Sequence, residues 1–141
     1  MDGVGGLEAV VIDCADPESL AVFWAAMFGT EIVSREPEPP YYVDLAPVDG
    51  VPMIVFQQAD EPKTIKNRLH FDVRVQDIDA ATERLEALGG RRIDAEIGHE
   101  VGYAFRAVAD PEGNEFCLVH RDGLVDSAAT SAPTGPDPDE P

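Results

Sequence analysis

The chain contains 141 residues, of which 28 are acidic and 10 are basic, so its formal net charge at pH 7 is −18. This length is typical of one domain, and the large negative charge repels phosphate backbones and anionic lipid headgroups. We therefore expect neither nucleic acid nor a membrane surface as a partner. The first residues lack a signal-peptide pattern, and no apolar run reaches the ~20 residues of a membrane helix, so we expect a cytoplasmic protein.

The first half of the chain predicts one strand, one helix and three further strands. Residues 7–13 are rich in β-branched side chains, which favour a strand. Asp16 then suits a helix N-cap and Pro17 the first helical position. The helix carries apolar side chains at spacings 0, 3, 4 and 7 and ends at Gly29; these side chains are Leu20, Phe23, Trp24 and Met27. Turn residues separate the three strands expected at 31–35, 41–46 and 52–58.

The second half repeats this order. A strand is expected at residues 69–75, with Asp77 as the next N-cap and Gly90 as the next C-cap. The apolar stripe of the second helix is Ile78, Ala81, Leu85 and Leu88. Three strands are expected at 91–95, 102–109 and 114–120. Because the caps of the two halves differ by the same 61 positions, the pattern predicts a duplicated unit.

The predicted fold is therefore α+β, with two β-α-β-β-β modules, about 7–58 and 67–120, that form a cupped eight-stranded structure within one domain, 1–120. The alternative is a ferredoxin-like sandwich with a chance repeat. One helix covers only one face of each sheet, so the open faces form a cup within one chain or between two chains. Residues 121–141 are acidic and Pro-rich, which predicts a disordered tail.

These features resemble a known group of proteins. The paired modules, the Asp16-Pro17 pair, the Asp110-Pro-Glu-Gly-Asn114 turn and the segment PKTIKNRLHFD at 62–72 are similar to those of the vicinal oxygen chelate (VOC) superfamily. Within it, the chain resembles the glyoxalase-like domain proteins of the glyoxalase, bleomycin resistance protein and dioxygenase group. The resemblance implies a small-molecule ligand in the cup, and it implies dimers. A homodimer would also cover the open edges of the sheets.

The resemblance further implies metal-ligand positions on the first and last strand of each module. Those positions fall on Ala9, on Val55 or Gln57, on His70 and on Cys117. Alanine and valine donate no lone pair to a metal, and a catalytic site needs about three protein ligands. We therefore expect no cofactor; a divalent metal, if one binds, would take His70, Gln57 and Cys117.

Strand alternation predicts the other residues of the cup. Asp72 and Arg74 share a face with His70, and Gln57 shares one with Val55. Tyr103 is expected in its aromatic wall. His70 as an acid–base group and Cys117 as a thiolate are the catalytic candidates. The alternatives are a hydrogen-bonded structural histidine and a buried, inert cysteine. Arg74 and Arg106 would hold a substrate anion or pair with Asp13, Asp72 and Glu115.

Three of the ten basic residues lie within 61–68, in the linker between the modules: Lys63, Lys66 and Arg68. Such a linker would contact acidic groups of the neighbouring module or subunit, or it would attract an anionic ligand. The favoured function is binding of a small organic molecule without the metal quartet, as a resistance or sequestration protein or as a metal-free enzyme. The alternative is a metal-dependent lyase, isomerase or dioxygenase of the glyoxalase I type.

Overall fold

A computed structural model describes residues 3–122, which form two helices and nine strands. Nearly all of the expected tail, 121–141, lies outside the described residues. Neither helix in the described part is long and apolar enough to cross a membrane. The elements in chain order are β1 (Ala9–Cys14), α1 (Pro17–Phe28), β2 (Ile32–Glu36), β3 (Tyr42–Leu45), β4 (Met53–Gln58), β5 (Asp72–Arg74), α2 (Ile78–Ala87), β6 (Arg91–Arg92), β7 (Gly98–Glu100), β8 (Tyr103–Ala109) and β9 (Glu115–Arg121).

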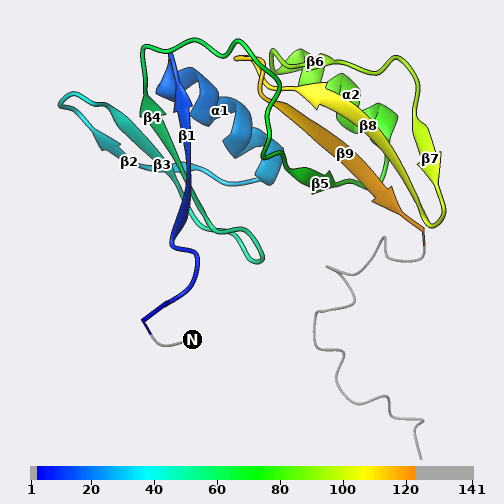
Figure 1. The fold of residues 1–141 in the computed structure, drawn as a ribbon, viewed down its shortest axis with the longest axis horizontal. Helices are drawn as coiled ribbons and strands as arrows, with labels where there is room; N and C mark the ends of the chain where they lie inside the picture. The colour runs from blue at the N-terminus through cyan, green and yellow to red at the C-terminus, as the bar shows by residue number, and fades with distance from the viewer. Residues whose placement is uncertain (1–2, 123–141) are drawn as a thin grey trace, which may run out of the picture.

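The strands form two sheets with the same connectivity. The first has the order β1-β4-β3-β2, and the second has the order β5-β9-β8-β6, with β7 also paired to β8. In each sheet the first and last strands of the module run parallel, and the other pairs are antiparallel. The two β-α-β-β-β modules lie side by side (Figure 1). This confirms the predicted α+β fold and excludes the ferredoxin-like alternative; β7 is a ninth strand that was not predicted.

The observed helix caps match the predicted ones at three of the four helix ends. The carboxylate of Asp16 accepts a hydrogen bond from the Ser19 amide at 3.1 Å, and that of Asp77 accepts one from the Ala80 amide at 3.0 Å. Gly29 ends α1 in the left-handed conformation, at φ 67°. The prediction of Gly90 as the second C-cap is wrong, because α2 already ends at Ala87, with Leu88 at the C-cap.

One aromatic cluster joins the modules. The ring of Trp24 on α1 lies 4.6 Å from that of Phe116 on β9 and 5.8 Å from that of Phe71, centroid to centroid. Phe23 packs against both Trp24 and Phe116. Phe23, Trp24 and Phe116 are buried, so α1 is covered by its own sheet and by Phe71 and β9 of the second module.

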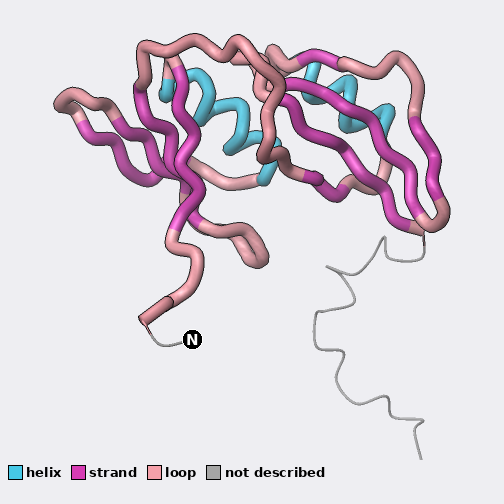
Figure 2. The backbone as a smooth tube through the Cα atoms, in the orientation of Figure 1, coloured by secondary structure: helices cyan, strands magenta, loops and turns pink. Residues whose placement is uncertain are grey.

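The strand expected at 69–75 is shorter than predicted. Leu69, expected in the core, is 76% exposed, and His70 precedes β5 rather than lying in it. Pairing with β9 begins only where the Phe71 carbonyl accepts a hydrogen bond from the Cys117 amide at 2.9 Å. Before that point the chain belongs to the linker, 59–71, which Figure 2 shows as a loop that crosses from one module to the other.

Candidate functional site

His70 and Cys117 lie on the wall of one cavity of about 290 Å³ on the second module. The wall combines the end of the linker, the residue after β6, and strands β8 and β9. Its residues are Lys66, His70, Ile93, Ala107, Glu115, Phe116 and Cys117. We call this cavity the His70 hollow. The structure thus brings together the two catalytic candidates, one from a loop and one from a strand.

His70 also lines two cavities at the junction of the modules. The first, of about 280 Å³, has β1 residues Val10–Asp13 on one side and Asn67 and Asn114 among the residues of the other. The second, of about 300 Å³, includes Val51 and Pro52 from the β3–β4 connection. The His70 side chain is exposed. His70 thus contributes to the walls of three cavities, two of which lie between the modules.

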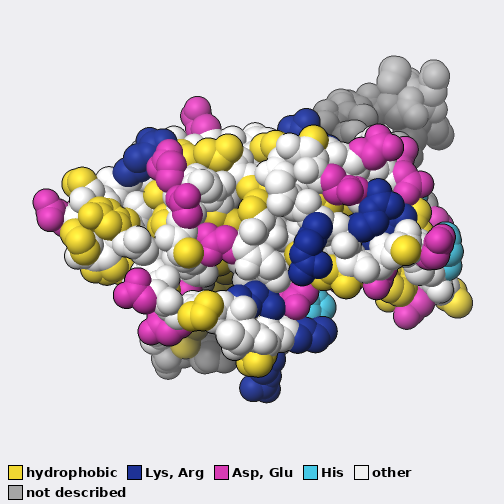
Figure 3. All heavy atoms as spheres, turned by 90° about the horizontal axis from the view of Figure 1, so that it is seen from above, with side chains coloured by type: hydrophobic (Ala, Val, Ile, Leu, Met, Phe, Trp, Pro, Cys, Tyr) yellow, Lys and Arg dark blue, Asp and Glu magenta, His cyan; other side chains and the backbone are white. Residues whose placement is uncertain are grey.

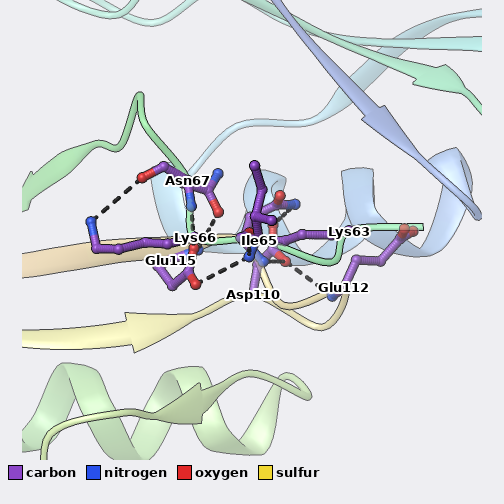
Figure 4. Close-up of polar contacts among 8 residues, drawn as sticks. Lys63, Ile65, Lys66, Asn67, Asp110, Glu112 and Glu115 are labelled. Carbon is purple, nitrogen blue, oxygen red and sulfur yellow. Dashed lines mark hydrogen bonds and ion pairs between the residues drawn. The ribbon is translucent and has the colours of Figure 1, made fainter. Parts of the chain in front are cut away.

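The linker is fastened to the start of β9 by Glu115. One carboxylate oxygen accepts the Asn67 amide proton at 2.9 Å, and the other accepts a proton from the Lys63 ammonium group at 3.1 Å. The Glu115 amide in turn donates to the side-chain oxygen of Asn67 at 3.1 Å. Figure 4 shows these side chains in one cluster. The Asn67 hydrogen bond and, next, that of Lys63 lower the pKa of Glu115. The expectation that the basic linker contacts an acid of the neighbouring module is confirmed for Lys63.

The Asp110–Asn114 turn fastens the modules to each other. The indole N–H of Trp24 donates to the Asp110 carboxylate at 3.1 Å. The Glu112 carboxylate accepts the amide protons of Ala15 and Asp16, at 2.6 and 2.9 Å, at the start of α1. The sequence indicated a turn here, but these contacts with the other module could not be read from the local pattern.

Neither cysteine has the environment of a reactive thiolate. Burial and the nearby carboxylates of Asp72 and Asp94 raise the pKa of Cys117. Burial, followed by the charge of Glu112, raises the pKa of Cys14 to about 12. The Cys117 side chain therefore reaches the His70 hollow as a neutral thiol, which matches the inert alternative better than the nucleophilic one.

The other predicted ligand-binding residues, Tyr103 apart, lie on β5 or on the first sheet. Asp72 pairs with Cys117 across β5 and β9, and Arg74 pairs with Val119. Gln57 lies beside Asp13, and Val55 beside Val11, in the first sheet. The fourth position, Ala9, pairs with Met53. The set that the resemblance implies is thus divided between two sheets within one chain.

Tyr103 begins β8, four residues from Ala107 of the hollow. Its hydroxyl donates a hydrogen bond to the Glu100 carboxylate at 2.8 Å, and this bond raises the pKa of Tyr103. The Arg121 guanidinium lies over its ring, 5.8 Å from the centroid. The ring lies 5.7 Å from that of Phe105, so the two residues form an aromatic wall at this end of the second sheet.

Arg106 is buried and pairs with Asp79, so neither role expected for it, holding a substrate anion or pairing with Asp13, Asp72 or Glu115, matches the structure. Its side chain is buried, and its guanidinium donates to Asp79 at 3.0 Å, to Thr82 at 2.9 Å and to the Ala95 carbonyl at 3.2 Å. The physical reason is strand alternation: on β8, residue 106 shares a face with the buried Val108, which packs under α2.

The residues do not form a metal site of the expected kind. Within residues 3–122, no group of three or more His, Cys, Asp or Glu side chains is placed to hold a metal ion. His70 and Cys117 share a hollow, but Gln57 lies on the other sheet and Ala9 provides no ligand atom. A metal bound by one chain would therefore lack the third strong ligand that catalytic sites use.

We compared the chain with known protein families, curated proteins and solved structures. The glyoxalase-like domain family matches residues 9–119. A search of curated proteins finds no match. Among solved structures, a glyoxalase/bleomycin resistance protein/dioxygenase family enzyme from Burkholderia phytofirmans is 20% identical, with a TM-score of 0.67, over 81% of this chain and 97% of its own.

A second similar structure is a mutant of the fosfomycin resistance protein FosX from Listeria monocytogenes, complexed with Mn(II) and 1S,2S-dihydroxypropylphosphonic acid. It is 17% identical, with a TM-score of 0.65, over 89% of this chain and 98% of its own. A hypothetical protein from S. aureus is 17% identical, with a TM-score of 0.65, over 83% of this chain and 94% of its own. At these identities the likeness concerns the fold.

Proposed function

The chain belongs to the glyoxalase-like domain family of the VOC superfamily, and on this premise we propose that it binds a small organic molecule in the His70 hollow without a metal quartet. The observation that carries the proposal is the composition of the hollow. Ile93, Ala107 and Cys117 supply apolar surface, while Lys66 and His70 supply polar anchors. Small-molecule sites have this mixture of apolar wall and few polar groups.

The chemistry of the hollow favours binding, or acid–base catalysis by His70, over nucleophilic catalysis. A raised pKa keeps Cys117 protonated at neutral pH, and a thiol is a weak nucleophile. Histidine is the residue type used most often for general acid–base catalysis, so His70 is the acid–base candidate. The proposal thus covers a resistance or sequestration protein and a metal-free enzyme with His70 as its proton carrier.

The test is a ligand screen on protein stripped of metal. A small-molecule library is screened by thermal shift in the presence of EDTA, and each hit is repeated with His70→Ala and with His99→Ala, whose histidine lies on β7 away from the hollow. The proposal predicts hits that survive EDTA, lose affinity with His70→Ala and keep it with His99→Ala. Stoichiometric metal in untreated protein, lost together with ligand binding in His70→Ala, would instead support the metal-dependent alternative.

We also propose that the protein is a homodimer. The face of the first sheet away from α1 carries Val11, which is 51% exposed, and half-buried Met53 and Val55. A second copy would cover this apolar face and the open edge of β1, which among the described strands pairs only with β4. Light scattering at micromolar concentration is expected to give twice the chain mass of 15.2 kDa. A mass of one chain would contradict the dimer.

A further inference from the structure

Lys66 brings an uncompensated positive charge to the His70 hollow. Among residues 3–122 its ammonium group reaches only the carbonyl of Asn67, at 3.5 Å, which is long for a hydrogen bond. The neighbouring Lys63 is instead paired with Glu115 at 3.1 Å. Figure 3 shows lysine and arginine side chains gathered with a histidine on the upper face of the molecule, to which the linker contributes.

The acidic group in the wall of the hollow is already neutralised. Glu115 accepts hydrogen bonds from Lys63 and from the Asn67 amide, so its charge is balanced by groups of the linker. The Cys117 thiol, Ile93 and Ala107 carry no charge. An anion beside Lys66 therefore meets no unbalanced carboxylate in the wall itself.

Two acids just outside the wall limit how much negative charge the hollow accepts. The charges of Asp72 and Asp94 both act on Cys117, in the opposite direction to that of Lys66. The Asp94 carboxylate is fixed near the hollow because it accepts the Ala107 amide proton at 3.1 Å. The electrostatic field therefore has a positive end at Lys66 and a negative end at Asp72 and Asp94.

We propose that the ligand of the His70 hollow is an organic monoanion with a compact apolar body. Its acid group binds Lys66, and its body lies against Ile93, Ala107 and Cys117. A volume of about 290 Å³ is at the small end of ligand sites, which span ~300–1,000 Å³, so the ligand is small. This inference rests on the proposed function and adds the chemical class of the ligand.

The test uses carboxylic acids and their uncharged amides as matched probes: benzoate with benzamide, and phenylacetate with phenylacetamide. Binding is followed by NMR through the backbone amide signals of Ala107 and Cys117. We expect each acid to bind at least fivefold more tightly than its amide, and Lys66→Gln to abolish this preference. Arg68→Gln is the control, because Arg68 is an exposed cation of the same linker that does not line the hollow. It should keep the preference.

Any of the following results would overturn the inference. Equal binding of acids and amides to the native protein contradicts the anionic class but leaves the proposed function intact. Loss of the preference in Arg68→Gln as well as in Lys66→Gln would mean that only the overall charge matters. Phenylphosphonate as a dianion should bind more weakly than benzoate, and tighter binding would contradict the monoanion. If no probe shifts the two signals, the inference is contradicted, while the proposed function is decided separately by the ligand screen.

Discussion

Asp110 connects the modules through a single buried carboxylate. It is 2% exposed, and one oxygen accepts the amide protons of Glu112 and Asn114 at 3.0 and 2.9 Å. The other accepts protons from the Asn114 side chain at 2.9 Å and the Trp24 indole at 3.1 Å. A buried charge is tolerated only when hydrogen bonds replace its water, and here four of them do so. The carboxylate thereby fixes the turn before β9 against α1.

Asp110→Asn is expected to lower the free energy of unfolding by about 2–3 kcal/mol. The new amide would turn its N–H₂ group toward the donors of Trp24 and Asn114, and a buried donor would be left without an acceptor. Urea unfolding followed by circular dichroism measures the loss. Asp60→Asn removes the same charge from an exposed loop and should have almost no effect. Equal stability of the two variants would contradict the role of Asp110.

The thiols provide a pH-dependent prediction. Because the folded state raises the pKa of Cys14 from 9.0 to about 12, the thiol contributes stability below pH 9 that is lost as the pH rises from 9 toward 12. At pH 9 only on the order of one Cys14 in a thousand is ionised. We expect iodoacetamide to leave Cys14 unmodified in the folded protein at pH 8, and to modify Cys117 more slowly than free glutathione. Rapid alkylation of Cys117 at pH 7.5 would restore it as a nucleophile candidate.

At the scale of elements, the hydrogen bonds of the linker determine the residue at which the chain joins the second sheet. The reciprocal hydrogen bonds between Asn67 and Glu115 hold residues 63–67 on β9, so the chain joins the sheet only at Phe71. This places His70 in a loop at the module junction instead of in a strand. The linker therefore positions both Lys66 and His70 on the wall of the hollow.

Glu115→Gln is expected to loosen the linker without unfolding the domain. The ion pair with Lys63 is partly exposed, so its loss should cost less than ~1 kcal/mol of global stability. Hydrogen exchange at the Asn67 amide should nevertheless become several-fold faster, because its acceptor loses its charge. Glu61→Gln, at an exposed linker position, is the matched control. An unchanged exchange rate at Asn67 would contradict the clamp.

Gly90 shows why one helix end could not be predicted. A glycine after an apolar stripe indicates a C-cap, but here its role is close packing. A Cβ at this position would lie 2.3 Å from the Leu85 Cδ1 atom and 2.8 Å from the Ala109 carbonyl oxygen. Part of that constraint comes from Ala109 on β8, which is distant in sequence, so the local pattern does not reveal it.

Gly90→Ala is expected to destabilise the fold by about 1–3 kcal/mol, because the added methyl group overpacks Leu85 and the backbone of Ala109. Thermal unfolding measures the effect. Gly5→Ala is the control, since a Cβ there meets no atom within 4 Å. A Gly90→Ala variant as stable as the native protein would show that Leu85 moves aside freely.

At the scale of the whole molecule, the duplicated pattern was sufficient to predict both modules. Local sequence rules predicted the N-caps at Asp16 and Asp77 and the apolar stripes of both helices, and the structure confirms these predictions. The site was predicted only in part: alternation placed Cys117 toward the open face, but the partners of Arg106 and Asp110 come from other elements. Such contacts depend on how helices cross sheets and how modules pack, which spacing along one chain does not encode.

The central claim is that a small molecule binds in the His70 hollow of this chain. A crystal structure of the protein with its tightest-binding carboxylic acid tests this most directly. We predict electron density for the acid group beside the Lys66 ammonium group and for the body against Ala107 and Cys117, with no metal ion between ligand and protein. Density on the first sheet against Gln57 and Val55, or a ligand held through a metal bound to His70, would contradict the account.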